Sequence, residues 1–138
     1  MANQIKYLDR GQGVAWAAPS ILTGPELIAD HKEIFSRDLV AKPYLYAFAD
    51  WGALTGTTIS IAEMREVVSI DFRASRSIPN FVVATYAKDD LPFGLARMWQ
   101  TLAERTGWES CIFRNKSEAV GWMKARVAER SGIQVAFE

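Results

Sequence analysis

Three aspartates follow apolar segments that read as buried strands, and they are the first candidates for chemistry. Asp50 follows segment 44–49, and Asp89 and Asp90 follow segment 81–87. Because parallel strands end at the same edge of a sheet, these carboxylates could meet there and act as acid and base. An aspartate before a helix also caps it by accepting backbone N–H groups, and this role accounts for Asp90 and is favoured for Asp89. For Asp50 both roles stay open.

Hydroxyl side chains gather between the aspartate at position 50 and the next predicted helix. They are Thr55, Thr57, Thr58 and Ser60. Ser60 and Glu63 have the spacing of a capping box, which gives Ser60 a structural role. A hydroxyl at a helix N-terminus also suits phosphorylation, because the phosphate would meet free amides and the positive end of the helix dipole. Ser60, and after it Thr58, are therefore the candidate phosphorylation sites.

Aromatic residues near the same loop suggest a pocket. Trp51 lies in the loop directly after segment 44–49, where a large apolar side chain either covers the core or binds something. Trp99 lies beside the apolar stripe of a later helix and could meet Trp51 or Phe93. These three rings would line an apolar pocket for a small ligand.

Three basic residues, Lys88, Arg97 and Arg114, could come near this edge. Together with helix N-termini they could hold a phosphate or a carboxylate. A solvated charged face is the simpler interpretation, because the chain has sixteen basic residues in all.

The residue types that most often carry catalysis or metals have simpler explanations here. His31, the one histidine, lies in the apolar stripe of the first predicted helix, away from the strand ends, and is interpreted as a core or rim residue. Cys111, the one cysteine, lies on a short strand that is expected to be buried, with no second ligand at a zinc spacing. The glycines of segment 11–13 lack the third glycine of a dinucleotide fingerprint. We therefore expect no catalytic residue, no metal and no cofactor, and hydrolysis at the aspartates stays a third hypothesis.

The elements that position these residues follow from apolar spacing and capping signals. Strands are expected at 5–8, 13–18, 44–49, 81–87 and 110–113, and helices at 23–40, 60–74, 90–102 and 115–131. The first two strands form a hairpin, and strands joined through helices imply right-handed parallel crossovers. The expected fold is one α/β domain over residues 1–138, with a mixed, mainly parallel sheet, an antiparallel N-terminal hairpin and four helices. Segment 44–49 reads as the central strand.

The tail, residues 133–137, alternates apolar with polar or small side chains, as a strand does. Such a strand could add to an open sheet edge of the same chain or of a second copy. Pairing with a second copy would favour a homodimer.

Charge and hydropathy narrow the function further. Sixteen acidic residues balance the sixteen basic ones over 138 residues, so no global field attracts nucleic acid or anionic lipid. No apolar run approaches the roughly 20 residues of a membrane span. One cysteine and the lack of a long apolar N-terminal segment favour a cytoplasmic protein.

The order of elements resembles the STAS-like domains, also called SpoIIAA-like or anti-sigma-factor-antagonist-like. Residues 49–51 close the third strand and Ser60 opens the next helix, as in that family, and segments 81–84, 94–98 and 113–123 are similar to one bacterial branch of it. Antagonist members carry a phosphorylatable serine in an Asp-Ser-[Ser/Thr]-Gly-like motif at the start of this helix. Residues 52–60 lack the Asp-Ser pair, so that motif does not carry over, and Ser60 is the closest positional match.

The resemblance implies a non-catalytic regulatory or protein-interaction module rather than an enzyme. Its binding surface would be the loop 50–60 with the start of the following helix. The related lipid-binding branch implies the alternative, a carrier of a small apolar molecule or lipid in the aromatic pocket. The candidate binding residues are Asp50, Trp51, Thr55, Thr58, Ser60, Phe93, Arg97 and Trp99.

Overall fold

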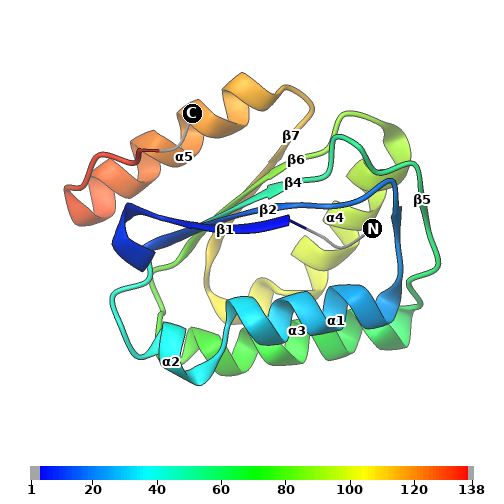
Figure 1. Ribbon diagram of the computed structural model, residues 1–138, viewed down its shortest axis with the longest axis horizontal. Helices are drawn as coiled ribbons and strands as arrows, with labels where there is room; N and C mark the ends of the chain where they lie inside the picture. The colour runs from blue at the N-terminus through cyan, green and yellow to red at the C-terminus, as the bar shows by residue number, and fades with distance from the viewer. Residues whose placement is uncertain (1–3, 137–138) are drawn as a thin grey trace.

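A five-stranded sheet forms the centre of the computed structural model, which describes residues 4–136 (Figure 1). Its strands, in spatial order, are β1 (Gln4–Leu8), β2 (Gly13–Ala17), β4 (Tyr46–Asp50), β6 (Val82–Tyr86) and β7 (Glu109–Phe113). β1 and β2 pair antiparallel, and the other neighbours pair parallel. The predicted mixed sheet with an N-terminal hairpin and a central strand at β4 is confirmed. Cys111 is half-buried rather than buried, because β7 is an edge strand.

Helices cover both faces of the sheet. They are α1 (Gly24–Ile34), α2 (Arg37–Val40), α3 (Ile61–Ser75), α4 (Asp90–Leu102) and α5 (Lys116–Ser131), with short 3-10 turns at Asp9–Gly11 and Glu104–Thr106. α1, α3 and α4 lie on one side of the sheet and α5 lies on the other (Figure 1).

The helix expected at 23–40 is divided into α1 and α2, which gives five α-helices in place of four. Phe35 leaves the helical conformation, with φ −110° and ψ 36°, and Ser36 begins the next helix in an extended conformation. The Phe35 ring packs against Phe81 and Trp108, with centroids 5.5 and 5.1 Å away. The break thus directs an aromatic ring into the core, and serine is a favoured residue at the restart.

Three of the predicted caps form. Thr23 with Glu26 and Ser60 with Glu63 make complete capping boxes, and Asn115 accepts a hydrogen bond from the Glu118 amide. Asp89 occupies the N-cap position of α4, but its side chain accepts no capping hydrogen bond, which corrects the role expected for it.

A second, two-stranded parallel sheet of β3 (Ile21–Leu22) and β5 (Gly56–Thr57) was not predicted. It fastens the loop after β4 to the segment after β2. Side-chain hydroxyls strengthen the connection, because Thr55 Oγ1 donates to the Ser20 carbonyl at 3.1 Å and Thr57 Oγ1 to the Leu22 carbonyl at 2.9 Å.

The strand expected in the tail is absent over residues 133–136, and Phe137 lies outside the described residues. Gly132, with φ +77°, turns the chain back over the α5 face of the sheet, and Val135 is buried with Tyr46 in the core under α5. The Ala136 amide donates to Asp9 Oδ1 at 3.1 Å. The tail therefore gains core burial in place of the expected strand, and its pairing with a second copy stays a prediction.

Candidate functional site

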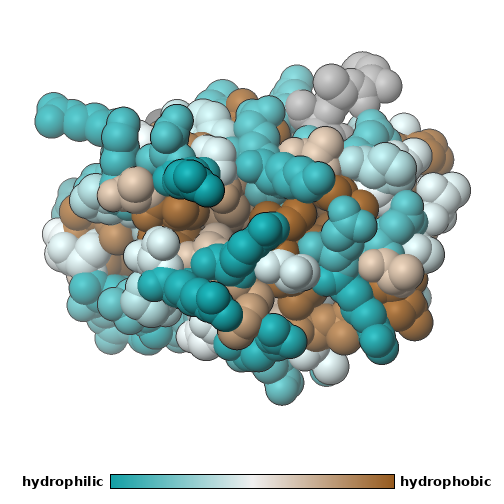
Figure 2. Space-filling view, turned by 90° about the horizontal axis from the view of Figure 1, so that it is seen from below, coloured by the Kyte–Doolittle hydropathy of each residue, from teal (hydrophilic) through white to brown (hydrophobic). Residues whose placement is uncertain are grey.

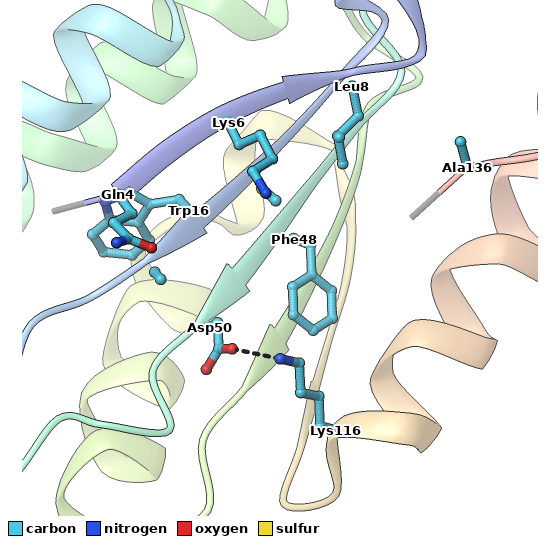
Figure 3. A pocket seen from close by; sticks show the side chains of 10 residues that line it. Gln4, Lys6, Leu8, Trp16, Phe48, Asp50, Lys116 and Ala136 are labelled. Carbon is cyan, nitrogen blue, oxygen red and sulfur yellow. Dashed lines mark ion pairs between the residues drawn. The ribbon is translucent and has the colours of Figure 1, made fainter. Parts of the chain in front are cut away.

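Asp50 ends β4 on the α5 face of the sheet. Its Oδ2 lies 3.1 Å from Nζ of Lys116 (Figure 3), and its Oδ1 accepts a 2.9 Å hydrogen bond from the Gly52 amide. Asp90 instead pairs with Arg114, at 2.9 Å. Two of the three carboxylates expected at this edge, Asp50 and Asp90, thus each meet a cation, which is unlike the pairing of an acid with a base.

Trp51, the next residue, enters the opposite side of the sheet. Its side chain is 4% exposed and meets Trp16 edge-on, with ring centroids 5.6 Å apart. Both rings line an apolar cavity of about 50 Å³ between the sheet and helices α1 and α4, together with His31 and Trp99. The buried Nε1 of Trp51 has no hydrogen-bond partner among the described residues.

A polar network that the sequence did not reveal lies beside this cavity. Asp71 on α3 is fully buried; its Oδ1 lies 2.6 Å from Nδ1 of His31 and its Oδ2 accepts a 2.8 Å hydrogen bond from Nε1 of Trp99. The network satisfies the carboxylate from two helices, which is the condition for burying it. The available signal was the position of Asp71, seven residues after Met64 on the apolar face of α3.

His31 therefore has a hydrogen-bonding role as well as the rim position expected for it. It forms part of the cavity wall, and its partner is a carboxylate on α3. A nucleophilic triad would need a serine, threonine or cysteine at its other ring nitrogen, and the described residues show no such hydrogen bond.

Phe93 does not line this cavity. Its ring lies under Arg114, whose guanidinium carbon is 4.2 Å from the ring centroid. Of the three rings considered as a pocket, the structure brings Trp51 and Trp99 together and places Phe93 elsewhere on α4.

The loop hydroxyls differ in the hydrogen bonds they make and in their exposure to solvent. Thr55 and Thr57 hold the small sheet, and Ser60 Oγ accepts the Glu63 amide at 3.1 Å. Thr58 and Ser60 are exposed. The two candidate phosphorylation sites are therefore accessible, and one of them also caps α3.

Three exposed apolar side chains follow the carboxyl ends of parallel strands, one in β3 and the others at the starts of α3 and α4. Ile21, Ile61 and Leu91 are 54%, 57% and 46% exposed, and Tyr7 is the one further large apolar residue exposed in the described chain. A groove of about 350 Å³ continues from Ile61 between α3 and α4, lined also by Arg65, Arg97 and Met98. We use the name carboxyl-end surface for the following six residues: Ile21, Ile61, Arg65, Leu91, Arg97 and Met98. Figure 2 shows the side of the molecule that carries α1 and α3, where apolar patches lie between hydrophilic side chains.

The described residues show neither the pattern of a metal site nor that of a membrane-spanning helix. No cluster of three or more histidine, cysteine, aspartate or glutamate side chains there has the arrangement of a metal site. Within the same residues, no helix has the length and apolarity to cross a membrane.

Comparison with known proteins supports the fold. No protein-family model matches the chain, and no curated protein matches it. Among solved structures, an uncharacterized protein of the DUF3478 family from Shewanella loihica PV-4, described as having a SpoIIAA-like fold, superimposes with a TM-score of 0.55 at 18% identity. The match covers 88% of this chain and 92% of that one. The predicted SpoIIAA-like, STAS-like fold is thereby confirmed.

Proposed function

We propose that the protein is a non-catalytic interaction module that binds a protein partner through its carboxyl-end surface. One observation carries this proposal: three of the four large apolar side chains exposed in the described chain lie at that end. Ile61 also borders the groove between α3 and α4, and an exposed apolar side chain beside a groove favours a binding site. The fold match is consistent with such a module.

The charges of this surface define the partner. Arg65 and Arg97 lie in the groove beside Ile61, and neither forms an ion pair with a described residue. A partner that places an apolar side chain on Ile61, with acidic residues beside it, would match both the apolar and the positive parts of the groove. An acidic amphipathic segment has this chemistry.

Ser60 supplies the regulatory part of the proposal. It is exposed, adjoins Ile61 and begins α3, so a phosphate on it would lie beside the partner-binding residues and at the positive end of the helix dipole. A phosphate would compete with acidic groups of the partner for the same arginines. Phosphorylation is therefore expected to weaken binding.

Site-specific photo-crosslinking tests the surface. Benzoylphenylalanine in place of Leu91 is expected to capture one product of defined mass in cells of the source organism, and the same residue in place of Lys32, exposed on α1, is not. Adding Ile61→Asp should remove the Leu91 product, and the variant should fold because aspartate is favoured in a first helical turn. Equal capture from both positions, or a product that persists with Ile61→Asp, would refute the proposal that the carboxyl-end surface binds a partner.

The orphan Nε1 of Trp51 favours a second function, a carrier of a small apolar molecule with one hydrogen-bond acceptor. A buried N–H without a partner costs about 1–3 kcal/mol, which a ligand oxygen would recover. The cavity of about 50 Å³ accommodates a water molecule, so a larger ligand would require the helices to separate. Native mass spectrometry of the purified protein decides: a retained ligand supports the carrier, and the chain mass alone supports the interaction module.

A further inference from the structure

The α5 face of the sheet contains a groove that the proposed function does not use. α5 packs over β4, β6 and β7, and beside it a groove of about 490 Å³ extends over β1, β2 and the end of β4 (Figure 3). The carboxyl-end surface lies with α3 and α4 on the other side of the sheet, so the two surfaces are separate.

The register of the strands explains why the groove forms. Residues that lie opposite each other in paired strands share a face of the sheet. Two rows cross this face: Lys6, Ala15 and Phe48 form one, and Gln4, Ala17 and Asp50 form the other. In both rows β2 contributes an alanine between two longer side chains, while Val14 and Trp16 of the same strand point to the other face. The alternation along β2 therefore makes a trough with an apolar floor.

The walls of this trough carry a positive charge without a partner. Lys6 extends over the groove in Figure 3, and no described carboxylate forms an ion pair with it. Lys116 reaches in from the first turn of α5 and pairs with Asp50. Two lysines and one aspartate leave the lining with one net positive charge, and the positive end of the α5 dipole adds to it.

We propose that this groove binds a small organic anion. Its apolar body would lie on Ala15, Ala17 and Phe48, and its acidic group would lie between Lys6 and Lys116. The volume is within the range of roughly 300–1,000 Å³ of small-ligand sites. Charge complementarity selects an anion over a neutral or cationic ligand of the same shape.

Two dyes with the same ring system provide the test. One is 8-anilinonaphthalene-1-sulfonate, an organic anion, and the other is N-phenyl-1-naphthylamine, which lacks the sulfonate. The wild-type protein is expected to bind the sulfonate more tightly than the amine, as measured by fluorescence titration. Lys6→Gln should weaken sulfonate binding roughly fivefold and leave the amine unchanged. Ala17→Leu fills the trough and should weaken both dyes by about tenfold or more.

Matched controls locate the effect. Lys32→Gln and Ala62→Leu change exposed residues on α1 and α3 and should leave both affinities as in the wild type. Amide shifts in a nuclear magnetic resonance titration should appear in β1 and β2. Equal affinities for the two dyes, no effect of Lys6→Gln, or shifts confined to the start of α3 would each overturn the proposal. Lys6 is exposed, so its variant gives an answer even where Ala17→Leu does not fold.

Discussion

Trp99 Nε1 donates a 2.8 Å hydrogen bond to Oδ2 of Asp71, whose side chain has no solvent exposure. The other oxygen of the same carboxylate lies 2.6 Å from Nδ1 of His31. One acidic group on α3 thus connects α1 and α4, and both of its partners, His31 and Trp99, line the cavity that Trp51 also lines.

Removing this carboxylate should destabilise the fold strongly. Asp71→Leu leaves the indole N–H of Trp99 and the imidazole of His31 without their partner, and we expect a loss of about 3 kcal/mol in the free energy of unfolding. Asp71→Asn keeps an acceptor for Trp99 and should cost about 1–2 kcal/mol. Urea denaturation measures both, with Asp38→Leu on the exposed part of α2 as the control. Wild-type stability in Asp71→Leu would show that the network does not hold the helices.

The two buried indoles should respond differently to one substitution. Trp99→Phe and Trp51→Phe remove similar volume, but only Trp99 loses a hydrogen bond. Trp99→Phe is therefore expected to lower the free energy of unfolding by about 1 kcal/mol more than Trp51→Phe. Equal losses in thermal or urea unfolding would mean that Trp51 Nε1 has a bound partner.

Ser60 should contribute to stability as a cap, independently of any partner. Ser60→Ala removes the acceptor for the Glu63 amide and is expected to cost about 1 kcal/mol, whereas Ser60→Asp keeps an acceptor and should be close to wild type. Thr58→Ala lies outside the capping box and serves as the control. Urea denaturation that finds Ser60→Ala as stable as Ser60→Asp would contradict the capping role.

Asp30 should make stability depend on pH. Burial raises the pKa of its carboxyl above the ordinary value of 3.8, and the hydrogen bond from Trp16 Nε1 only partly opposes this. Because the folded state raises the pKa of Asp30, folding favours the protonated carboxyl. The stability that Asp30 contributes is therefore fully present below about pH 3.8 and is lost as the pH rises through the pKa of the folded state. Asp30→Asn should therefore gain stability relative to wild type as the pH rises from 3.5 to 7. A constant difference across this range in urea unfolding would contradict the shift.

The tail should stabilise its own chain. Val135 is 7% exposed in the core under α5, so Val135→Ala is expected to cost about 2 kcal/mol. The exposed Gln134→Ala is the control. Deleting residues 133–138 should lower stability further without changing the oligomeric state in size-exclusion chromatography. A change of oligomeric state on deletion would restore a role for the tail in pairing between copies.

The sequence predicts this fold well where the determining signals are local. The capping boxes at Thr23 and Ser60 depend on residues three apart, and the buried run at 44–49 indicates the central strand directly. The division at Phe35 was missed because it depends on packing against Phe81 and Trp108, which lie far along the chain. β3 and β5, with two residues each, are too short for a periodic pattern.

The candidate site was less predictable, because it depends on tertiary contacts. Asp71 lies 40 residues from His31 and 28 from Trp99, and nothing in their spacing indicates a shared hydrogen-bond network. The loop between β4 and α3 lies where the sequence predicts it, and its role as a binding surface stays a prediction. The groove beside Asp50 follows from the register of β1, β2 and β4, which only the folded sheet defines.

The affinity of the crosslinked partner for Ile61→Asp tests the central claim most directly. We expect binding by isothermal titration calorimetry to be at least about tenfold weaker than for the wild type, because the variant removes an apolar contact and adds a charge that repels an acidic partner. Lys32→Gln, which lowers the net charge by the same one unit at an exposed position on α1, should bind as the wild type does. Unchanged affinity in a folded Ile61→Asp variant would contradict the proposal that the carboxyl-end surface is the binding site.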